Sequence, residues 1–276
     1  MSLLLRAIQL LLALSLLSFA PAAVLAQDAE KPFEPTVGQE GKDVIWVPTP
    51  LILVEKMLDM AKVTPKDFVM DLGSGDGRNI IAAGKRGARA VGVEYNPKMV
   101  EFSRAAAEKE GVADKAQFVE GDMFAADISQ ATVLALFLLP DNLRKLTPKF
   151  LDMRPGSRIV ANGFGIDGWE ADETGKVDGD CGSWCTAYLY IVPAKVAGTW
   201  KLQQGELTLE QKFQMVSGTL NAGGKRVPIS NGKLSGDLIT FTAAGTDYSG
   251  RVKGQTMQGK AKGATTGSWT ATRSDL

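Results

Sequence analysis

A glycine-rich turn between an apolar run and a helical pattern contains the first residues that could do chemistry. The eight residues that begin at Asp71 read DLGSGDGR, with glycine at every second position of the turn. Glycine lets the backbone turn sharply and approach a ligand, and the first N–H groups of the next helix have no partner inside it. The NAD fingerprint GxGxxG would need glycine where Arg78 stands. The spacing therefore favours a nucleoside ligand without a pyrophosphate, bound by Asp71, Gly73, Ser74, Gly75 and Gly77.

Two more carboxylates follow the next two predicted strands. Glu94 ends the second strand, and Asp122 and Met123 follow the third in the run EGDM. We expect Glu94 to accept hydrogen bonds from both hydroxyls of a ribose, as acidic residues do in dinucleotide folds. We expect Asp122 to accept from an adenine amino group while Met123 packs on the ring. Strand ends of an open α/β sheet meet at one crevice, so the three elements predict a single site. The alternative is a set of turn glycines and loop carboxylates with no common ligand.

The elements that position these residues alternate along the chain. Thr49 is expected to cap the first helix, with Pro50 as its first residue. The alternation predicts a Rossmann-like α/β domain over 43–195, with a mostly parallel sheet and helices on both faces. Strands are predicted at 68–72, 90–94, 117–120, 132–139, 158–162 and 186–192, and helices at 50–61, 79–85, 96–110 and 141–150.

Helical periodicity is missing from the last part of the chain. Short alternating runs recur there around Ser-Gly pairs, which suits antiparallel strands. We predict a small all-β domain over 196–276, a meander or barrel of about seven or eight strands. Trp200 and Trp269, near its two ends, are expected to plug its core.

Composition excludes several kinds of enzyme. The 276 residues include 31 Lys and Arg, 31 Asp and Glu, and no histidine. Without histidine there is no Ser-His-Asp triad, no HExxH zinc site and no histidine general base. No metal site is predicted. Zero net charge gives no basic footprint, so no nucleic-acid partner is expected.

The first residues have the pattern of a targeting segment. Residues 1–26 have one early arginine, an apolar core over 10–20 and small residues before Gln27, which predicts a secretory signal peptide. An uncleaved anchor is the alternative, but this core is shorter than the roughly 20 residues that span a bilayer. Residues 27–42 are predicted to be a linker. We expect an exported protein, periplasmic or secreted, with no stable transmembrane span after signal removal.

Export makes the two cysteines relevant. Cys181 and Cys185 lie four residues apart around Gly-Ser-Trp, and in an oxidising compartment they can close a small disulfide. Two free thiols are the alternative. The spacing is not CxxC, so a thioredoxin-like redox role is poorly supported.

The motif order resembles that of the class I S-adenosylmethionine-dependent methyltransferases. DLGSGDGR, VGVE and EGDM match the three cofactor motifs of that superfamily in order, over residues 43 to 195. VPTP before the first helix, KRGA at 85–88 and FLLP at 137–140 are similar to the ATP synthase c-subunit lysine methyltransferases. The resemblance implies S-adenosylmethionine as cofactor and methylation of a protein lysine. It implies an acceptor side near Thr49, Asp141 and Asn142, because the residues after the fourth strand face the methyl group in this fold.

Two hypotheses of different class remain open. The first is a methyltransferase that uses Glu94 and Asp122 to hold its cofactor. The second is an exported binding protein whose β-domain recognises a ligand or partner, with the α/β domain as a non-catalytic scaffold. The glycine spacing disfavours a nucleotide-dependent oxidoreductase.

Overall fold

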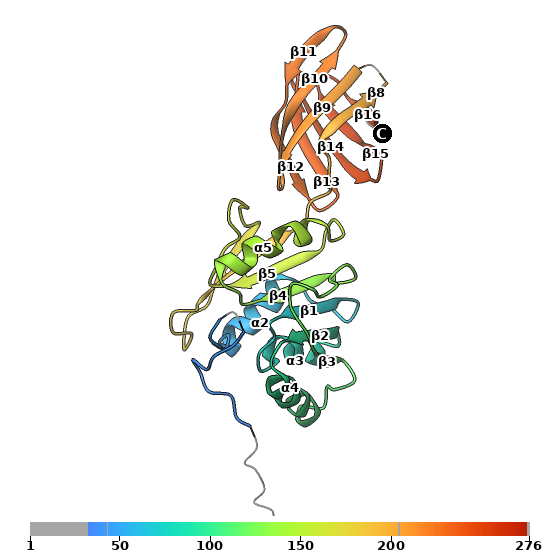
Figure 1. The fold of residues 1–276 in the computed structure, drawn as a ribbon. Coiled ribbons are helices and arrows are strands. Elements are labelled where there is room, and N and C mark those ends of the chain that lie inside the picture. The colour runs from blue at the N-terminus through green and yellow to red at the C-terminus, as the bar shows by residue number, and fades with distance from the viewer. Residues whose placement is uncertain (1–32, 43, 204, 275–276) are drawn as a thin grey trace, which may run out of the picture. The chain divides into compact units, whose positions relative to one another are not determined.

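The computed structural model describes residues 33–42, 44–203 and 205–274 (Figure 1). The predicted signal peptide and the first part of the predicted linker lie outside these residues. In the described residues no helix combines the length and the apolar character that crossing a bilayer requires.

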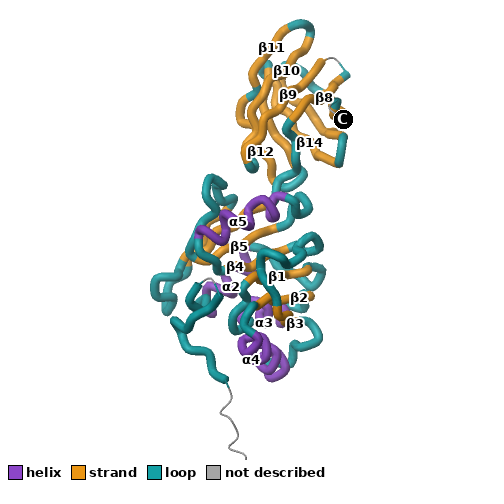
Figure 2. The backbone as a smooth tube through the Cα atoms, viewed as in Figure 1, coloured by secondary structure: helices purple, strands orange, loops and turns teal. Residues whose placement is uncertain are grey.

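The first sheet belongs to an α/β domain, as the alternating pattern predicts (Figure 2). It has seven strands, the six that were predicted and β6, which was not. Its order is β3-β2-β1-β4-β5-β7-β6, and neighbouring strands are parallel from β3 to β5. β7 runs antiparallel to β5, and β6 antiparallel to β7. The strands are β1 Phe68–Leu72, β2 Arg89–Glu94, β3 Ala116–Glu120, β4 Val133–Leu136, β5 Arg158–Asn162, β6 Glu173–Lys176 and β7 Thr186–Ile191.

Four helices cover the two faces of this sheet. Side chains of α2 (Leu51–Met60), α3 (Arg78–Lys85) and α4 (Pro97–Lys109) share a core cluster with Val133 and Ala135. Side chains of α5 (Pro140–Leu151) share the other cluster with Leu134 and Leu136. Successive strand residues point to opposite faces, so β4 is buried on both sides. The predicted fold class is therefore confirmed.

Two local predictions at helix starts have different outcomes. The Asn96 side chain accepts a hydrogen bond from the Lys98 N–H at 3.0 Å, with proline in the first turn of α4. The prediction that Thr49 caps α2 is wrong, because Pro50 holds the cap position without a side-chain bond. The Thr49 hydroxyl instead accepts from the amide of Asn162 at 3.2 Å. A tertiary contact takes the hydroxyl that the local pattern assigned to the helix.

The second sheet is an antiparallel barrel. Its order is β11-β10-β12-β13-β14-β15-β16-β8-β9, and β9 also pairs with β10, which closes the ring. β11 and β12 pair with different parts of β10, so eight strands close the ring and β11 is an addition. The strands are β8 Gly198–Leu202, β9 Gly205–Lys212, β10 Met215–Ala222, β11 Lys225–Pro228, β12 Ser230–Ser235, β13 Leu238–Ala243, β14 Thr246–Lys253, β15 Thr256–Gly263 and β16 Gly267–Arg273.

The barrel core contains both predicted tryptophans. Trp200 is fully buried, and its indole N–H donates to the Val196 carbonyl at 2.8 Å. Trp269 is also buried, and its indole N–H donates to the Ser249 carbonyl at 3.1 Å. The core-plug prediction is confirmed. Each indole has a hydrogen-bond acceptor, which removes the cost of burying a polar N–H.

Candidate cofactor and acceptor site

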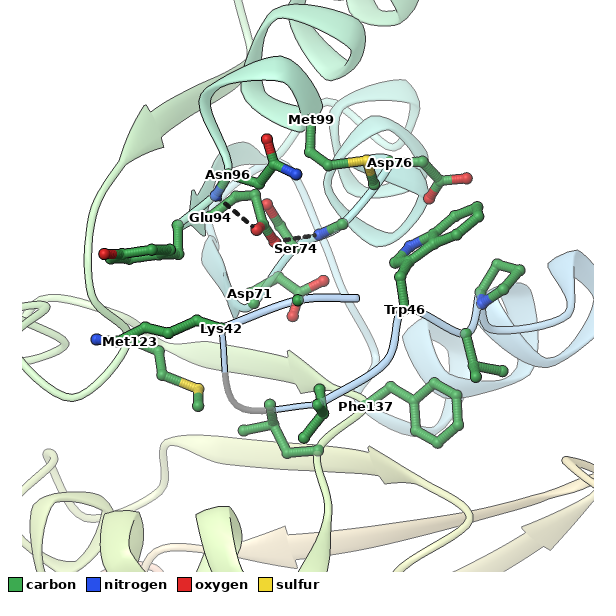
Figure 3. A pocket seen from close by; sticks show the side chains of 18 of the residues that line it. Lys42, Trp46, Asp71, Ser74, Asp76, Glu94, Asn96, Met99, Met123 and Phe137 are labelled. Carbon is green, nitrogen blue, oxygen red and sulfur yellow. Dashed lines mark hydrogen bonds between the residues drawn. The ribbon is translucent and has the colours of Figure 1, made fainter. Parts of the chain in front are cut away.

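A pocket opens where the predicted carboxylates and the glycine turn come together (Figure 3). Of the predicted cofactor residues, Gly77 alone does not line the pocket. It is the N-cap residue of α3, with φ +81°, and it packs on Phe118. A Cβ at Gly77 would lie 2.5 Å from the Phe118 ring. The predicted residues that line the pocket are Asp71, Gly73, Ser74, Gly75, Glu94, Asp122 and Met123.

Asp71 is a buried carboxyl with spare hydrogen-bonding capacity. It is 3% exposed at the end region of β1, and one oxygen accepts from the Asn79 amide at 2.9 Å. Its other oxygen, Oδ1, has no partner. Burial raises the pKa of Asp71 to about 8, and the nearby Glu94 and Asp76 carboxylates also raise it. The ligand-free carboxyl is therefore mostly protonated at neutral pH, and a donor or cation brought by a ligand would favour its ionised form.

Glu94 is fixed by the turn that it faces. Its two oxygens accept from the Gly75 N–H and the Asn96 N–H, each at 2.9 Å. Both bonds are drawn in Figure 3. A carboxylate oxygen has two lone-pair sites, so both oxygens can still accept from a ligand. The strand end and the glycine turn are thereby locked in one geometry.

Asp122 already has a basic neighbour. It accepts from the Phe124 N–H at 2.8 Å and from the Lys42 ammonium at 2.7 Å. The bond from Lys42 is the main reason that the pKa of Asp122 is lowered, so the group is a carboxylate at neutral pH. The Lys42 ammonium also lies 4.5 Å from the centroid of the Tyr95 ring. A residue from the predicted linker therefore reaches the cofactor side of the pocket.

Trp46 is a pocket residue that sequence reasoning missed. Its indole packs so closely on the glycine turn that a Cβ at Gly75 would lie 2.5 Å from the ring nitrogen. Gly75 also has φ +54°, which a side chain disfavours. The signal available in the sequence was an aromatic residue in WVPTP just before the first helix.

The structure separates the three predicted acceptor-side residues. Thr49 lines the pocket and is 3% exposed. Asn142 is buried outside the lining, with its amide nitrogen unpaired. Asp141 is exposed, forms an ion pair with Arg144 at 2.5 Å and is also outside the lining. Both residues lie in the first turn of α5, which begins at Pro140, and not in the segment after β4 that lines the pocket.

Residues that precede Asp141 and Asn142 in the chain line the pocket where these two do not. Phe137, Leu138 and Leu139 follow β4 and line the pocket, and Phe164 and Trp184 join them from distant loops. None of these five side chains is charged. The apolar run after β4 was predicted as a continuing strand, but β4 ends at Leu136 and the run turns into the pocket wall.

The donors and acceptors present fit a nucleoside with a cationic tail. Asp71 Oδ1 is an unpaired acceptor, and Glu94 and Asp122 present carboxylates along the same pocket. A Cβ at Gly73 would meet only Leu138, at 3.6 Å, so this part of the turn leaves room for a ligand.

Comparison with known proteins agrees with this geometry. The ANTKMT methyltransferase domain matches residues 71–173. A protein-lysine N-methyltransferase of Saccharolobus islandicus is 44% identical over 153 residues, which cover 54% of this chain and 94% of that protein. The chain therefore belongs to the same methyltransferase family as the Saccharolobus islandicus protein. An ATP synthase c-subunit lysine N-methyltransferase of Rattus norvegicus is 35% identical, over 47% of this chain and 60% of that protein.

A solved structure supports the cofactor assignment. An RNA methyltransferase from Salinibacter ruber, crystallised with S-adenosylhomocysteine, is 42% identical with a TM-score of 0.51. The match covers 54% of this chain and 96% of that chain. This chain is therefore an S-adenosylmethionine-dependent methyltransferase. The resemblance that its motifs indicated is confirmed. The cofactor supplies a methyl group already activated by its sulfonium, so the protein needs to bind it and to position an acceptor.

Proposed function

We propose that this methyltransferase transfers a methyl group to the side-chain amine of a lysine in a protein. The carrying observation is a set of uncharged side chains in the pocket lining, beside the predicted cofactor residues. Its members are Thr49, Phe137, Leu138, Phe164 and Trp184. The similarity to the Saccharolobus islandicus protein-lysine N-methyltransferase supports the proposal.

An uncharged wall suits an amine nucleophile. A lysine side chain must lose a proton before it can attack, and its ordinary pKa is about 10.4. Removing the ammonium from water lowers this pKa, which increases the neutral fraction. The aliphatic stem of lysine also packs well on aromatic and aliphatic side chains. A phosphodiester would instead need a basic group, and the two basic residues of the lining, Lys42 and Arg78, are already paired with Asp122 and Asp76.

We also propose that the enzyme acts outside the cytoplasm. The signal-peptide pattern of residues 1–26 supports this location. The Cys181–Cys185 disulfide supports it too, since disulfides persist mainly in oxidising compartments. The methyl acceptor would then be an exported protein. The alternative of a non-catalytic scaffold is not favoured, because Asp71, Glu94 and Asp122 all line the pocket.

A labelling experiment tests the acceptor. The purified chain is incubated with methyl-labelled S-adenosylmethionine and, separately, with the exported proteins and the total RNA of its source. We expect label on lysine side chains of a protein, located by mass spectrometry. At a cofactor concentration near the wild-type Kd, Glu94→Ala should strongly reduce labelling, whereas Glu120→Ala, at the end of β3 and outside the pocket lining, should not. Label in RNA alone, or in no protein, would overturn the lysine proposal.

A further inference from the structure

Three aromatic rings from three separate loops meet in the pocket lining. Phe137 follows β4, Phe164 follows β5, and Trp184 precedes β7. The Trp184 centroid lies 4.9 Å from that of Phe137 and 5.4 Å from that of Phe164, with edge-to-face geometry. All three residues are half-buried, so part of each side chain remains accessible.

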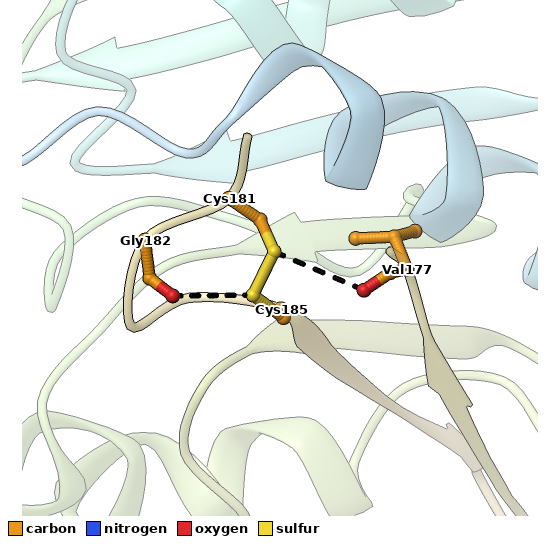
Figure 4. Close-up of a disulfide and its surroundings, with 4 residues drawn as sticks. All are labelled: Val177, Cys181, Gly182 and Cys185. Atoms are coloured by element: carbon orange, nitrogen blue, oxygen red, sulfur yellow. Dashed lines mark hydrogen bonds between the residues drawn. A yellow bond between two sulfur atoms is a disulfide. The ribbon is translucent and has the colours of Figure 1, made fainter. Parts of the chain in front are cut away.

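The position of Trp184 depends on a disulfide. Cys181 and Cys185 close a short loop around it, with their Cα atoms 5.2 Å apart (Figure 4). Inside the loop the backbone N–H of Trp184 donates to the Cys181 carbonyl at 2.9 Å. The ring packs directly on Gly163, where an added Cβ would lie 2.7 Å from it. Cross-linking so short a loop leaves its backbone few alternative conformations, and this holds the ring beside the strand end.

Methyl transfer to an amine places charge at this wall. As the nitrogen–carbon bond forms and the carbon–sulfur bond breaks, positive charge passes from sulfur to the acceptor nitrogen, which then loses a proton to water. Aromatic faces attract alkylammonium groups, most strongly at Trp and when water is excluded. The three rings can supply this attraction without a carboxylate, since the Asp76 carboxylate of the same lining is already paired with Arg78.

We propose that Trp184, together with Phe137 and Phe164, binds the alkylammonium group of the acceptor and determines specificity for it. The Cys181–Cys185 disulfide acts as a positioning element for Trp184. The inference rests on the proposed lysine function and assigns the acceptor wall within it. It predicts that acceptor recognition depends on the disulfide, while cofactor binding does not, because neither cysteine lines the pocket.

The test uses two ligands that differ only in charge. The full chain, saturated with S-adenosylhomocysteine, is titrated with N-acetyl-trimethyllysine methylamide and with its neutral analogue, in which carbon replaces the quaternary nitrogen. We expect millimolar binding and at least about a fivefold preference for the cation. Trp184→Ala should remove the preference, and Trp184→Phe should keep most of it. The paired change Cys181→Ser with Cys185→Ser should reduce it, as should reduction by dithiothreitol.

Calorimetry with S-adenosylhomocysteine on every sample distinguishes a variant that has lost its fold from one that has lost only acceptor recognition. Unchanged affinity in the variants, combined with a lost cation preference, supports the inference. Equal binding of the two ligands by the wild type, no binding of the cation at about 10 mM, or an unaltered preference in Trp184→Ala overturns it. If Trp184→Ala fails to fold, it loses S-adenosylhomocysteine too, and the comparison of the wild type with the paired Cys181→Ser and Cys185→Ser variant still decides, since an unaltered preference there overturns the inference. The proposed lysine function is tested separately, by the labelling experiment. It fails if the enzyme binds its cofactor but labels no lysine.

Discussion

Replacing Glu94 with alanine should weaken cofactor binding while leaving the fold in place. The carboxylate accepts from the backbone N–H groups of Gly75 and Asn96, both at 2.9 Å, and presents its remaining lone pairs to the pocket. In the cofactor complex these lone pairs would accept from the ribose hydroxyls. A hydrogen bond to a charged group contributes about 1.5–3 kcal/mol. Losing one such bond corresponds to roughly a 10- to 150-fold increase in Kd.

Calorimetric titration of S-adenosylhomocysteine measures this change. Glu120→Ala is the matched control, because Glu120 lies directly opposite Glu94 in the β2–β3 register but outside the pocket lining. Its Kd should equal that of the wild type. Glu94→Gln keeps one acceptor oxygen, so its loss should be intermediate. A 2′-deoxy analogue of the ligand should lose less affinity on Glu94→Ala than the parent does, because it lacks one of the affected hydroxyls.

Two results would contradict the role of Glu94 in holding the ribose. A Kd within threefold of the wild type in folded Glu94→Ala would show that the carboxylate does not hold the ribose. Equal losses in Glu94→Ala and Glu120→Ala would point to a general effect of negative charge on this edge of the sheet. Thermal unfolding of each variant shows whether the fold is retained.

Three further predictions concern the interior of the protein. Because the pKa of Asp71 is raised to about 8, its neutral form stabilises the ligand-free fold below about pH 4, and this contribution is lost as the pH rises to about 8. Denaturant unfolding at several pH values should therefore show a smaller decline in Asp71→Asn, and equal declines would refute the assignment. Gly75→Ala and Gly111→Ala should each cost about 1 kcal/mol of stability, because both glycines have positive φ. An added Cβ at Gly111 meets no atom, whereas at Gly75 it displaces Trp46. Only Gly75→Ala should therefore weaken S-adenosylhomocysteine binding, by tenfold or more. Trp200→Ala should destabilise the barrel by about 3–5 kcal/mol with an unchanged Kd, and a cost below 1 kcal/mol would mean that the indole does not carry the core.

Much of the cofactor site could be predicted because its signals are local. A turn with alternate glycines between a strand and a helix, and acidic residues at two later strand ends, need only a parallel sheet to bring them together. The pairing of β1 with β2 and of β2 with β3 does this for Asp71, Glu94 and Asp122. The nucleoside assignment therefore followed from spacing and strand order.

Some strands have only a weak pattern in the sequence. β6 is a four-residue edge strand of sequence ETGK, with neither an apolar run nor alternation. β11 and β12 divide one edge of β10 around Ile229, and the prediction of about seven or eight strands over 196–276 did not locate this division. Short polar edge strands are decided by their neighbours, since little of their own surface is buried.

The acceptor side was decided by tertiary structure. The sequence by itself determined the cofactor cradle, the two fold classes and the burial of the barrel tryptophans, because each depends on local periodicity, turn chemistry or strand order. It predicted Asp141 and Asn142 beside the acceptor, and the structure has them in the first turn of α5, outside the pocket lining. Phe164 and Trp184 reach the pocket from loops that follow β5 and precede β7. Their meeting with Phe137 depends on packing between segments far apart in the chain, and no spacing in the sequence encodes that contact.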